Sequence, residues 1–271
     1  MNRAVEISVG SLSPTINWSA LKMQEFDLPP LDQQRRIAEI LWAIDNDEQQ
    51  KASVAICTQS LLTAEFENEL DRLLDGPCER LDNILLRNPE SGCSAPPSPF
   101  ETGHYVLSLA SLSGNGYRRG NLKPIHPSKS MLDCTLSPGD FLISRSNTQE
   151  LVGRVGIFDE ERDDVSFPDT MMRLTVDEHR VNKRFLEAVL QSRRGRLHMR
   201  RSAAGTSGSM KKINRRTLGS CLIPLPALSV QDRLLKRKHR LYEIIDSANV
   251  SANSKRSLQQ VLIESFFEGL Q

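Results

Sequence analysis

Basic residues are concentrated in one segment of this chain, from His179 to Arg216. The segment holds twelve Lys and Arg residues against a single acid, Glu187, although the net charge of the whole chain is only +1. Inside it, residues 202–209 are small and rich in hydroxyl groups. The backbone of such a loop can approach phosphates closely, flanking cations neutralise their charge, and Arg can bond guanine edges. The pattern therefore predicts contacts with nucleic acid. The residues expected to make them are Arg200, Arg201, Gly205, Thr206, Ser207, Lys211 and Lys212.

A second candidate site is the segment 138–148, which passes from a Pro-Gly-Asp turn through an apolar strand into a polar loop. Arg, Asn, Ser and Thr are side chains that bond base edges or phosphates. The loop residues expected to do so are Arg145, Ser146, Asn147 and Thr148. A third candidate is the pair Arg118 and Arg119, which follows the Gly-Asn-Gly turn at 114–116. For each segment the alternative is a solvated basic surface beside an ordinary loop.

Signatures of catalysis are missing from the sequence. It has no phosphate-binding P-loop, no Gly-x-Ser-x-Gly elbow, no Asn/Asp-Pro-Pro-aromatic methyltransferase motif, and no pair of His residues at zinc-ligand spacing. Pro168-Asp169 followed by 178–180 only partly matches the core of a metal-dependent nuclease. Arg180 stands where that core needs Lys, and Arg cannot serve as a titrating base. We expect no catalytic activity, no metal and no cofactor in this chain.

The cysteines and the hydropathy pattern bear on the cellular compartment. Five cysteines are scattered without metal-ligand spacing, which is typical of reduced thiols in a cytosol, and Cys78 and Cys93 are the two that could approach each other. No signal peptide is visible at the N-terminus, and no apolar run reaches the ~18–20 residues of a membrane span. We expect a soluble, cytoplasmic protein.

One sequence pattern occurs twice, at an offset of 197 residues. The two copies run from 16 to 36 and from 213 to 233, and eight positions are identical between them. The offset is far longer than the roughly 20–50 residues of a solenoid repeat, so a whole domain is expected to lie between two equivalent junctions. The identical residues of the first copy are Ile16, Asn17, Leu21, Leu28, Pro29, Leu31, Gln34 and Arg36.

A long segment with helical apolar spacing follows each junction. Residues 31–75 contain neither Gly nor Pro and predict a helix of roughly 60 Å, and residues 228–271 predict a second helix. Because each helix has a single narrow apolar stripe, we expect the two to pair as an antiparallel coiled coil. The residues expected to face a partner helix are Ile37, Leu41, Ile44, Leu62, Phe66, Leu241, Ile245, Leu262 and Phe266.

Between the helices, the segment 78–227 has a different texture. Short β-type runs at 105–109, 141–144 and 152–158 precede helical spacing around 185–197. This mixture predicts an α+β or α/β domain, in which the strand order is left open.

At its two junctions the chain resembles the specificity subunits of type I restriction-modification systems. Those subunits end each target-recognition domain with Leu-Pro-Pro-Leu-x-x-Gln-x-x-Ile, followed by a long helix. Residues 28–37 fit this pattern closely, and residues 225–234 fit it more loosely. The glycine and hydroxyl loop that precedes an Asn in the family matches 205–214, and the Pro-Gly-Asp-x-Leu strand entry matches 138–142.

The resemblance implies a division of the chain into four parts: a remnant of a preceding target-recognition domain at 1–30, a long helix at 31–75, a target-recognition domain at 78–227 and a second long helix at 228–271. Family members usually have two complete recognition domains, so we expect a truncated or half-size subunit. Its partners would be double-stranded DNA, modification (methyltransferase) subunits that bind S-adenosylmethionine, and restriction subunits. A two-fold homodimer would supply two readers.

The sequence thus supports two functional hypotheses. In the first, the chain is a sequence-specific DNA-binding subunit that recognises a half-site and docks the modification subunit, without catalysis of its own. In the second, it is a coiled-coil adaptor or a relic that binds the modification subunit without specific DNA recognition. The DNA target and the spacer length cannot be deduced from residue spacing.

Overall fold

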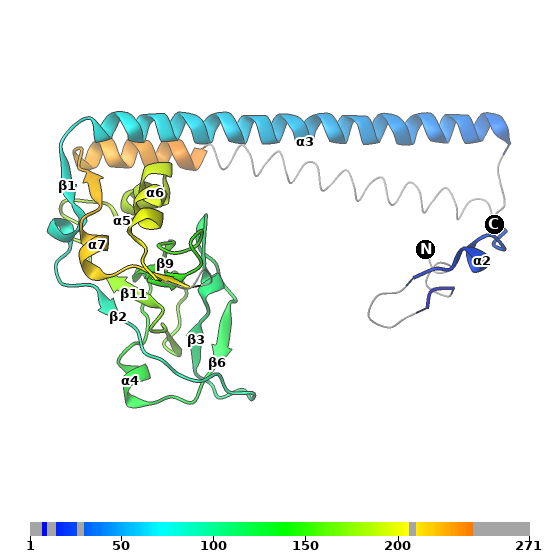
Figure 1. The fold of residues 1–271 in the computed structure, drawn as a ribbon. Coiled ribbons are helices and arrows are strands. Elements are labelled where there is room, and N and C mark those ends of the chain that lie inside the picture. Colours follow the sequence, from blue (N-terminus) through cyan, green and yellow to red (C-terminus); the bar gives the residue numbers. More distant parts are fainter. Residues whose placement is uncertain (1–6, 10–14, 26–29, 206–209, 241–271) are drawn as a thin grey trace. The chain divides into compact units, whose positions relative to one another are not determined.

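The computed structural model describes residues 7–9, 15–25, 30–205 and 210–240 (Figure 1). These residues belong to two units, which divide within the long helix α3 (Leu31–Leu74) between Cys57 and Thr58. In the described part of the chain, no helix is both long enough and apolar enough to cross a membrane.

Helix α3 is continuous over 44 residues, because no Gly or Pro interrupts it. Ile37, Leu41 and Ile44 are half-buried, and Phe66 packs against the core of the domain that follows. The second predicted helix is described only over residues 228–240. One long helix is therefore confirmed, and the coiled-coil pairing of two long helices stays a prediction. The Leu62 side chain and four further residues expected at that pairing lie outside the described part: Leu241, Ile245, Leu262 and Phe266.

The sequence repeat is also a repeat of local structure. Asn17 precedes the short helix α2 (Trp18–Leu21), and Asn214, 197 residues later, precedes α7 (Arg215–Gly219). Asn214 caps its helix by accepting a hydrogen bond from the Thr217 amide at 2.8 Å. Helix α3 and the helical residues 228–240 also begin at equivalent positions, Leu31 and residue 228. The shared residues therefore mark equivalent junctions, as the offset predicted.

The domain between the junctions is built mainly on antiparallel strands. Its largest sheet has four strands in the order β2-β11-β7-β9, all antiparallel, and a second sheet has the order β10-β3-β6 with one parallel pair, β10 and β3. This arrangement makes the domain α+β. The strand bounds are β2 Glu90–Ser91, β3 Tyr105–Leu107, β6 Leu122–Pro124, β7 Phe141–Ser144, β9 Val155–Ile157, β10 Val165–Ser166 and β11 Met171–Leu174.

The strands are shorter than the sequence predicted. The run at 105–109 ends as a strand at Leu107 and continues as a 3-10 turn, η2 (Leu109–Ser111). The run at 152–158 is a strand only over β9, because Gly153 adopts a left-handed φ of +74° and turns the chain just before it. The remaining short elements are η1 Leu81–Ile84, α4 Lys129–Leu132 and the hairpin of β4 Leu112–Ser113 with β5 Gly116–Tyr117.

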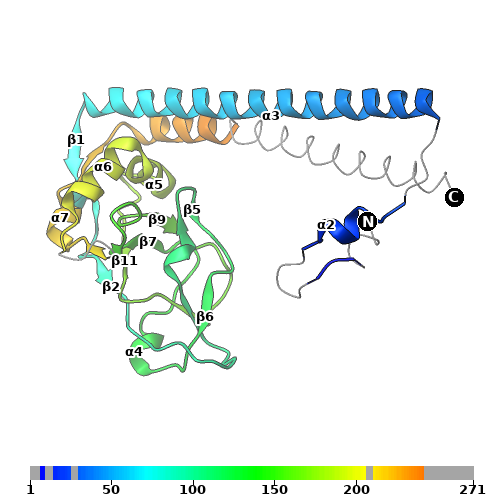
Figure 2. The same cartoon turned by 45° about the vertical axis from the view of Figure 1, so that its right-hand side comes forward.

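Helices α5 (Lys183–Gln191) and α6 (Arg193–Ser202) lie between the strands and the last turns of α3 (Figures 1 and 2). The main hydrophobic core joins all three layers, with Leu70 from α3, Phe185 from α5 and Phe141 from β7 among its buried members. The chain enters and leaves this domain through one antiparallel strand pair, β1 (Cys78–Arg80) with β13 (Leu222–Pro224). Entry and exit therefore lie side by side, next to the ends of both helices.

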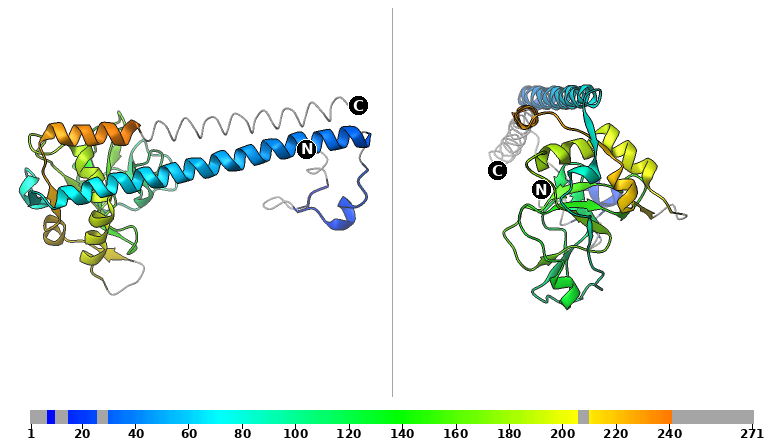
Figure 3. Two further views of the ribbon diagram at one scale, coloured as in Figure 1. Left: turned by 90° about the horizontal axis from the view of Figure 1, so that it is seen from above. Right: turned by 90° about the vertical axis from the view of Figure 1, so that its left-hand side faces the viewer.

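The start of the second helix is fixed by the junction residue Gln231, which is fully buried. Its side-chain carbonyl accepts a hydrogen bond from the Asn182 amide at 2.9 Å. Its side-chain amide donates to the carbonyls of Arg180, at 3.1 Å, and Pro226, at 2.9 Å. From there residues 228–240 run beside the last part of α3 in the opposite direction (Figure 3), and Arg237 pairs with Glu65 and Glu69 of α3.

We expect Gln231→Leu to lower the free energy of unfolding by roughly 2–4 kcal/mol, because it removes three hydrogen bonds from a fully buried side chain and leaves three partly buried backbone groups without these partners. Urea unfolding of the purified chain measures this change. Gln49→Ala, on an exposed face of α3, is the control and should change the free energy of unfolding by less than about 0.5 kcal/mol. Equal stability of the two variants would contradict the role given to Gln231.

Candidate nucleic-acid interface

Two of the three predicted contact segments are joined by a short antiparallel strand pair. Strand β8 (Ser146–Asn147) pairs with β12 (Lys211–Lys212), so that Lys211 lies opposite Asn147 and Lys212 lies opposite Ser146. The pairing continues beyond the strands, where the Ile213 amide donates to the Arg145 carbonyl at 2.9 Å. Segments more than 60 residues apart in sequence thus form one ribbon, which we call the β8–β12 ribbon.

The β12 side of the ribbon is bonded to the residues that precede it. Ala204 and Lys212 exchange both backbone hydrogen bonds, at 3.0 and 2.9 Å, and the Lys211 ammonium donates to the Gly205 carbonyl at 2.6 Å. Gly205 has a φ of +147°, and a Cβ there would lie 2.9 Å from the Met210 carbonyl oxygen, so a side chain at this position would be strained. Of the predicted contact residues in this loop, Thr206 and Ser207 lie outside the described part of the chain.

The fold divides the basic run into paired and unpaired cations. Six of its twelve Lys and Arg residues form ion pairs with carboxylates, five of them from acids outside the run. The charge of these six is compensated within the fold. The pairs are Arg180 with Glu79, Lys183 with Glu178, Arg184 with Glu187, Arg193 and Arg194 with Asp71, and Arg200 with Glu150.

The unpaired cations gather on the β8–β12 ribbon and the elements next to it. Arg201 lies in the last turn of α6, Lys212 lies on β12, and Arg215 and Arg216 begin α7; all four are exposed. Arg145, half-buried, immediately precedes β8. Within the described residues none of these five forms an ion pair with a carboxylate. Their positive charge therefore faces solvent without compensation, as a phosphate-binding surface requires.

Two residues expected to contact bases are instead part of the interior. Ser146 and Asn147 have exposed fractions of 4% and 9%. The Asn147 side-chain carbonyl accepts a hydrogen bond from the Thr148 amide at 2.9 Å, which fixes the start of the loop. Thr148 itself is exposed. Ser146 and Asn147 therefore position the loop, while Arg145 and Thr148 remain available for contact.

Helix α6 holds the other end of this loop. The side-chain amide of Gln149 donates to the Arg200 carbonyl at 2.6 Å, and the buried Arg196 guanidinium donates to the Glu150 carbonyl at 2.9 Å. Burial and the nearby charges of Arg154 and Arg200 lower the pKa of Arg196 to about 10, so it stays protonated at neutral pH. Its Nε and Nη1 atoms have no hydrogen-bond partner in the described structure.

In the third predicted segment, Arg119 forms an ion pair within the protein. Arg119 binds the Asp159 carboxylate at 3.0 Å and its carbonyl at 3.1 Å, so its partners lie after β9 rather than on the ribbon. Arg118 is exposed. Tyr117, just before them, packs edge-on against Phe158 and is part of the core.

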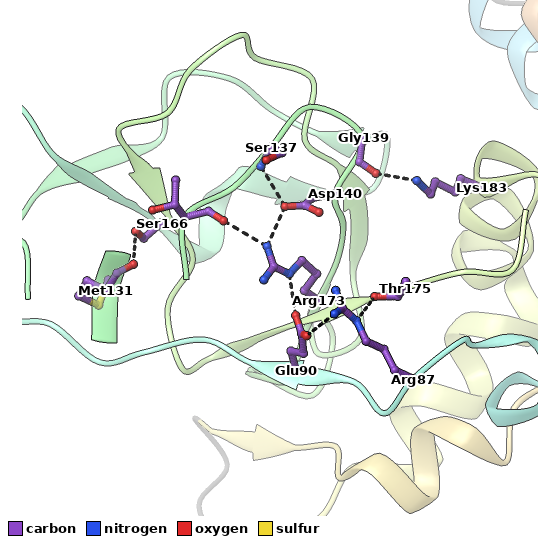
Figure 4. A network of polar contacts seen from close by, with 11 residues as sticks. Arg87, Glu90, Met131, Ser137, Gly139, Asp140, Ser166, Arg173, Thr175 and Lys183 are labelled. Atoms are coloured by element: carbon purple, nitrogen blue, oxygen red, sulfur yellow. Dashed lines mark hydrogen bonds and ion pairs between the residues drawn. The ribbon is translucent and has the colours of Figure 1, made fainter. Parts of the chain in front are cut away.

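The Pro-Gly-Asp turn before β7 has a structural role (Figure 4). The Asp140 carboxylate accepts a hydrogen bond from the Ser137 amide at 2.9 Å and from the Arg173 guanidinium at 3.0 Å. Arg173 also binds Glu90 at 2.9 Å, so it links β2, β11 and the turn. The strand-entry motif therefore stabilises the sheet that contains β7, the strand that precedes β8 in the chain.

The partial match to a nuclease core in the sequence involves Arg180 and nearby carboxylates. Within the described residues no three His, Cys, Asp or Glu side chains are grouped so that they could hold a metal ion. Arg180, which stands where a nuclease core needs Lys, pairs with Glu79 and donates a hydrogen bond to the Asn83 carbonyl at 2.9 Å.

Sequence reasoning passed over Arg215 and Arg216, which the structure adds to the candidate surface. Both were part of the basic run, but nothing in their spacing separated unpaired cations from paired ones. The signal that could have selected them is the capping residue Asn214, which predicts that a new helix starts there and presents both side chains at its first turn.

Whether α6 fixes the loop between β8 and β9 can be tested at Gly153. A Cβ at this residue would lie 2.6 Å from the Met199 side chain of α6. Gly103 has nearly the same left-handed φ, +72° against +74°, with nothing within 4 Å. We expect Gly103→Ala to cost about 1–2 kcal/mol from backbone strain alone and Gly153→Ala to cost a further ~1–3 kcal/mol from the clash. Denaturant unfolding measures both values. A cost for Gly153→Ala no larger than for Gly103→Ala would show that α6 does not fix the loop.

Comparisons with known proteins agree with the resemblance seen in the sequence, although no protein-family model matches the chain. It is 24% identical over 291 aligned residues to the specificity subunit of the type I restriction enzyme EcoKI from Escherichia coli K12, and 27% identical over 170 residues to that of StySPI from Salmonella potsdam. The alignments cover 96% and 60% of this chain. The chain spans 62% and 36% of the lengths of these curated relatives.

Solved structures show the same fold. A chain of a type I restriction-modification system superposes with a TM-score of 0.63 at 17% identity, covering 95% of this chain and 65% of that one. The HsdS subunit from Thermoanaerobacter tengcongensis superposes with a TM-score of 0.56 at 18% identity, covering all of this chain and 67% of that one. In sequence and in fold, the chain resembles the specificity subunits of type I restriction-modification systems.

Proposed function

We propose that the chain is a specificity subunit of a type I restriction-modification complex. Its domain at 78–227 binds a short DNA half-site in a sequence-specific way, and it has no catalytic role of its own. The observation that carries this proposal is the β8–β12 ribbon, with its group of exposed cations that no carboxylate of the described chain neutralises. A two-stranded ribbon is narrow enough to enter the major groove, where base edges differ from one another.

The contacts divide into two kinds under this proposal. Lys212, Arg215 and Arg216 bind phosphates, which fixes the domain on the duplex without sequence preference. Arg145 and Thr148, at the loop that Asn147 positions, contact base edges. Arg200 and Lys211, expected at first to contact DNA directly, have partners within the protein and hold the ribbon in shape.

The helices at 31–75 and 228–271 act as spacer and as docking surface for modification subunits, which supply S-adenosylmethionine chemistry. Exposed apolar side chains on α3 support this part of the proposal: Leu31, Trp42 and Ile56 have exposed fractions of 70%, 74% and 65%. On a helix these three positions share one face, and such a face favours burial against a protein partner. Two copies of the chain would present two readers and favour an interrupted palindromic target.

The same apolar face favours the second candidate, an adaptor that binds the modification subunit without recognising DNA. The two functions differ in what the ribbon's cations do. In the adaptor they are dispensable, whereas in the specificity subunit their removal weakens DNA binding.

The test compares two triple variants with equal loss of charge. The first, Lys212→Ala with Arg215→Ala and Arg216→Ala, removes unpaired cations beside the ribbon. The second, Arg184→Ala with Arg193→Ala and Arg194→Ala, removes exposed cations of the same run that are already ion-paired. Fluorescence anisotropy measures binding of each chain, mixed with the modification subunit, to duplexes selected from a random pool at several salt concentrations.

We expect the first variant to bind at least 100-fold more weakly and to lower the slope of log K against log salt by about 2–3, since each lost phosphate contact lowers it by about 0.9. The second should bind within about threefold of the unmodified chain. Both should elute with the modification subunit in size-exclusion chromatography, as the unmodified chain should. Equal losses in the two variants would reduce the effect to net charge, and no loss in either would favour the adaptor.

A further inference from the structure

We propose that Cys93 and Cys134 form an oxidisable dithiol that closes to an intramolecular disulfide. Their sulfur atoms lie 2.8 Å apart, well inside the ordinary contact distance of two sulfurs, although the residues are 41 positions apart in sequence. Both are free thiols in this structure. From the sequence, Cys78 and Cys93 were the two cysteines that could approach each other; in the fold, Cys134 is the one that lies next to Cys93.

The backbone, rather than a chance rotamer, brings the two cysteines together. Both flank the segment 166–168, which is hydrogen-bonded on each side. The Cys93 amide donates to the Phe167 carbonyl at 3.3 Å, and the Phe167 amide donates to the Cys134 carbonyl at 3.2 Å. A parallel bridge pairs Cys93 with Pro168, and an antiparallel bridge pairs Thr135 with Ser166. The sulfur–sulfur contact therefore belongs to the fold of the domain.

The two thiols differ in accessibility, which sets the order of the chemistry. Cys93 is half-buried, whereas Cys134 has an exposed fraction of only 6%. Burial and the hydrogen bond with Cys93 raise the pKa of Cys134 to about 12. Cys93 is therefore the thiol that an oxidant reaches first, and Cys134 is the one that completes the bridge.

A low-molecular-weight disulfide such as oxidised glutathione serves as the oxidant. The Cys93 thiolate attacks one of its sulfurs, which forms a mixed disulfide and releases one glutathione thiolate. Cys134 then loses its proton and attacks the Cys93 sulfur, and the second glutathione leaves as a thiolate. Two protein thiols become one disulfide while one glutathione disulfide becomes two thiols. Because the second step needs Cys134 deprotonated, closure should accelerate as the pH rises.

The disulfide would join the segment that follows β2 to the segment that follows α4. It closes a loop that contains β3, the β4–β5 hairpin, β6 and α4. The carbonyl of Thr135, next to Cys134, accepts a hydrogen bond from the Arg173 guanidinium at 3.1 Å. The disulfide would therefore also lie beside the contacts of Arg173 with Glu90 and Asp140. Closing a loop of this length restricts the unfolded chain and favours the folded one. This inference does not depend on the proposed function.

The test uses the full chain, incubated with reduced or oxidised glutathione, then denatured, alkylated with N-ethylmaleimide and digested. We expect oxidised protein to yield one cross-linked species containing Cys93 and Cys134, whose mass is two hydrogens below the sum of the reduced peptides. Its formation rate should rise between about pH 7 and pH 9. Oxidation should raise the melting temperature by on the order of 5–10 °C in the unmodified chain and in Cys57→Ser, but not in Cys93→Ser.

Three outcomes would overturn the proposal. They are a glutathione adduct that persists on Cys93, a bridge from Cys93 to Cys78, and alkylation of Cys93 that continues after oxidation as fast as that of the exposed Cys57. Peptide mapping of the unmodified chain decides among these even if Cys93→Ser fails to fold.

Discussion

The pairing of β8 with β12 is the constraint on which the candidate site depends. Each strand contributes only two residues, yet their register places a loop that follows β7 against the segment that follows α6. The fold supports this small ribbon from both ends. The buried side chain of Asn147 fixes the loop on one side, and the Ala204–Lys212 bonds hold the approach to β12 on the other. Without these contacts the basic residues would be scattered along the chain.

Charge compensation within the fold separates the cations near this ribbon from the rest of the basic run. The basic run looks uniform in sequence, but six of its cations meet carboxylates, and Asp71 of α3 alone binds two of them. The two ion pairs of Asp71, with Arg193 and Arg194, join α6 to α3. Of the six cations of the run without a carboxylate partner, Arg196 is buried and bonds the Glu150 carbonyl, while Arg201, Lys211, Lys212, Arg215 and Arg216 lie on the ribbon or next to it, as does Arg145 outside the run. The same residue types therefore form ion pairs on one side of the domain and, under the proposed function, contact DNA on the other.

Much of the architecture could be predicted from local rules. Paired prolines, the absence of Gly and Pro from 31–75, and an Asn before a short basic helix each act within a few residues, and the structure agrees with helix starts at Leu31 and 228. Contacts between residues far apart in the sequence could not be predicted. The burial of Ser146 and Asn147, the acids that neutralise the basic run and the approach of Cys134 to Cys93 all depend on strand order, which residue spacing does not determine. In the sequence, Gln231 stood out only as a residue shared by the two copies of the repeat, and its buried hydrogen bonds could not be predicted.

Amide hydrogen exchange of the complex with the modification subunit can show whether DNA binds at the β8–β12 ribbon, as we propose. With a selected duplex present, we expect slower exchange at 145–148, 201–205 and 210–216 than with a random duplex, and unchanged exchange around Glu90, Asp140 and Arg173. Protection confined to α3, or identical protection with selected and random duplexes, would contradict specific DNA binding at the ribbon.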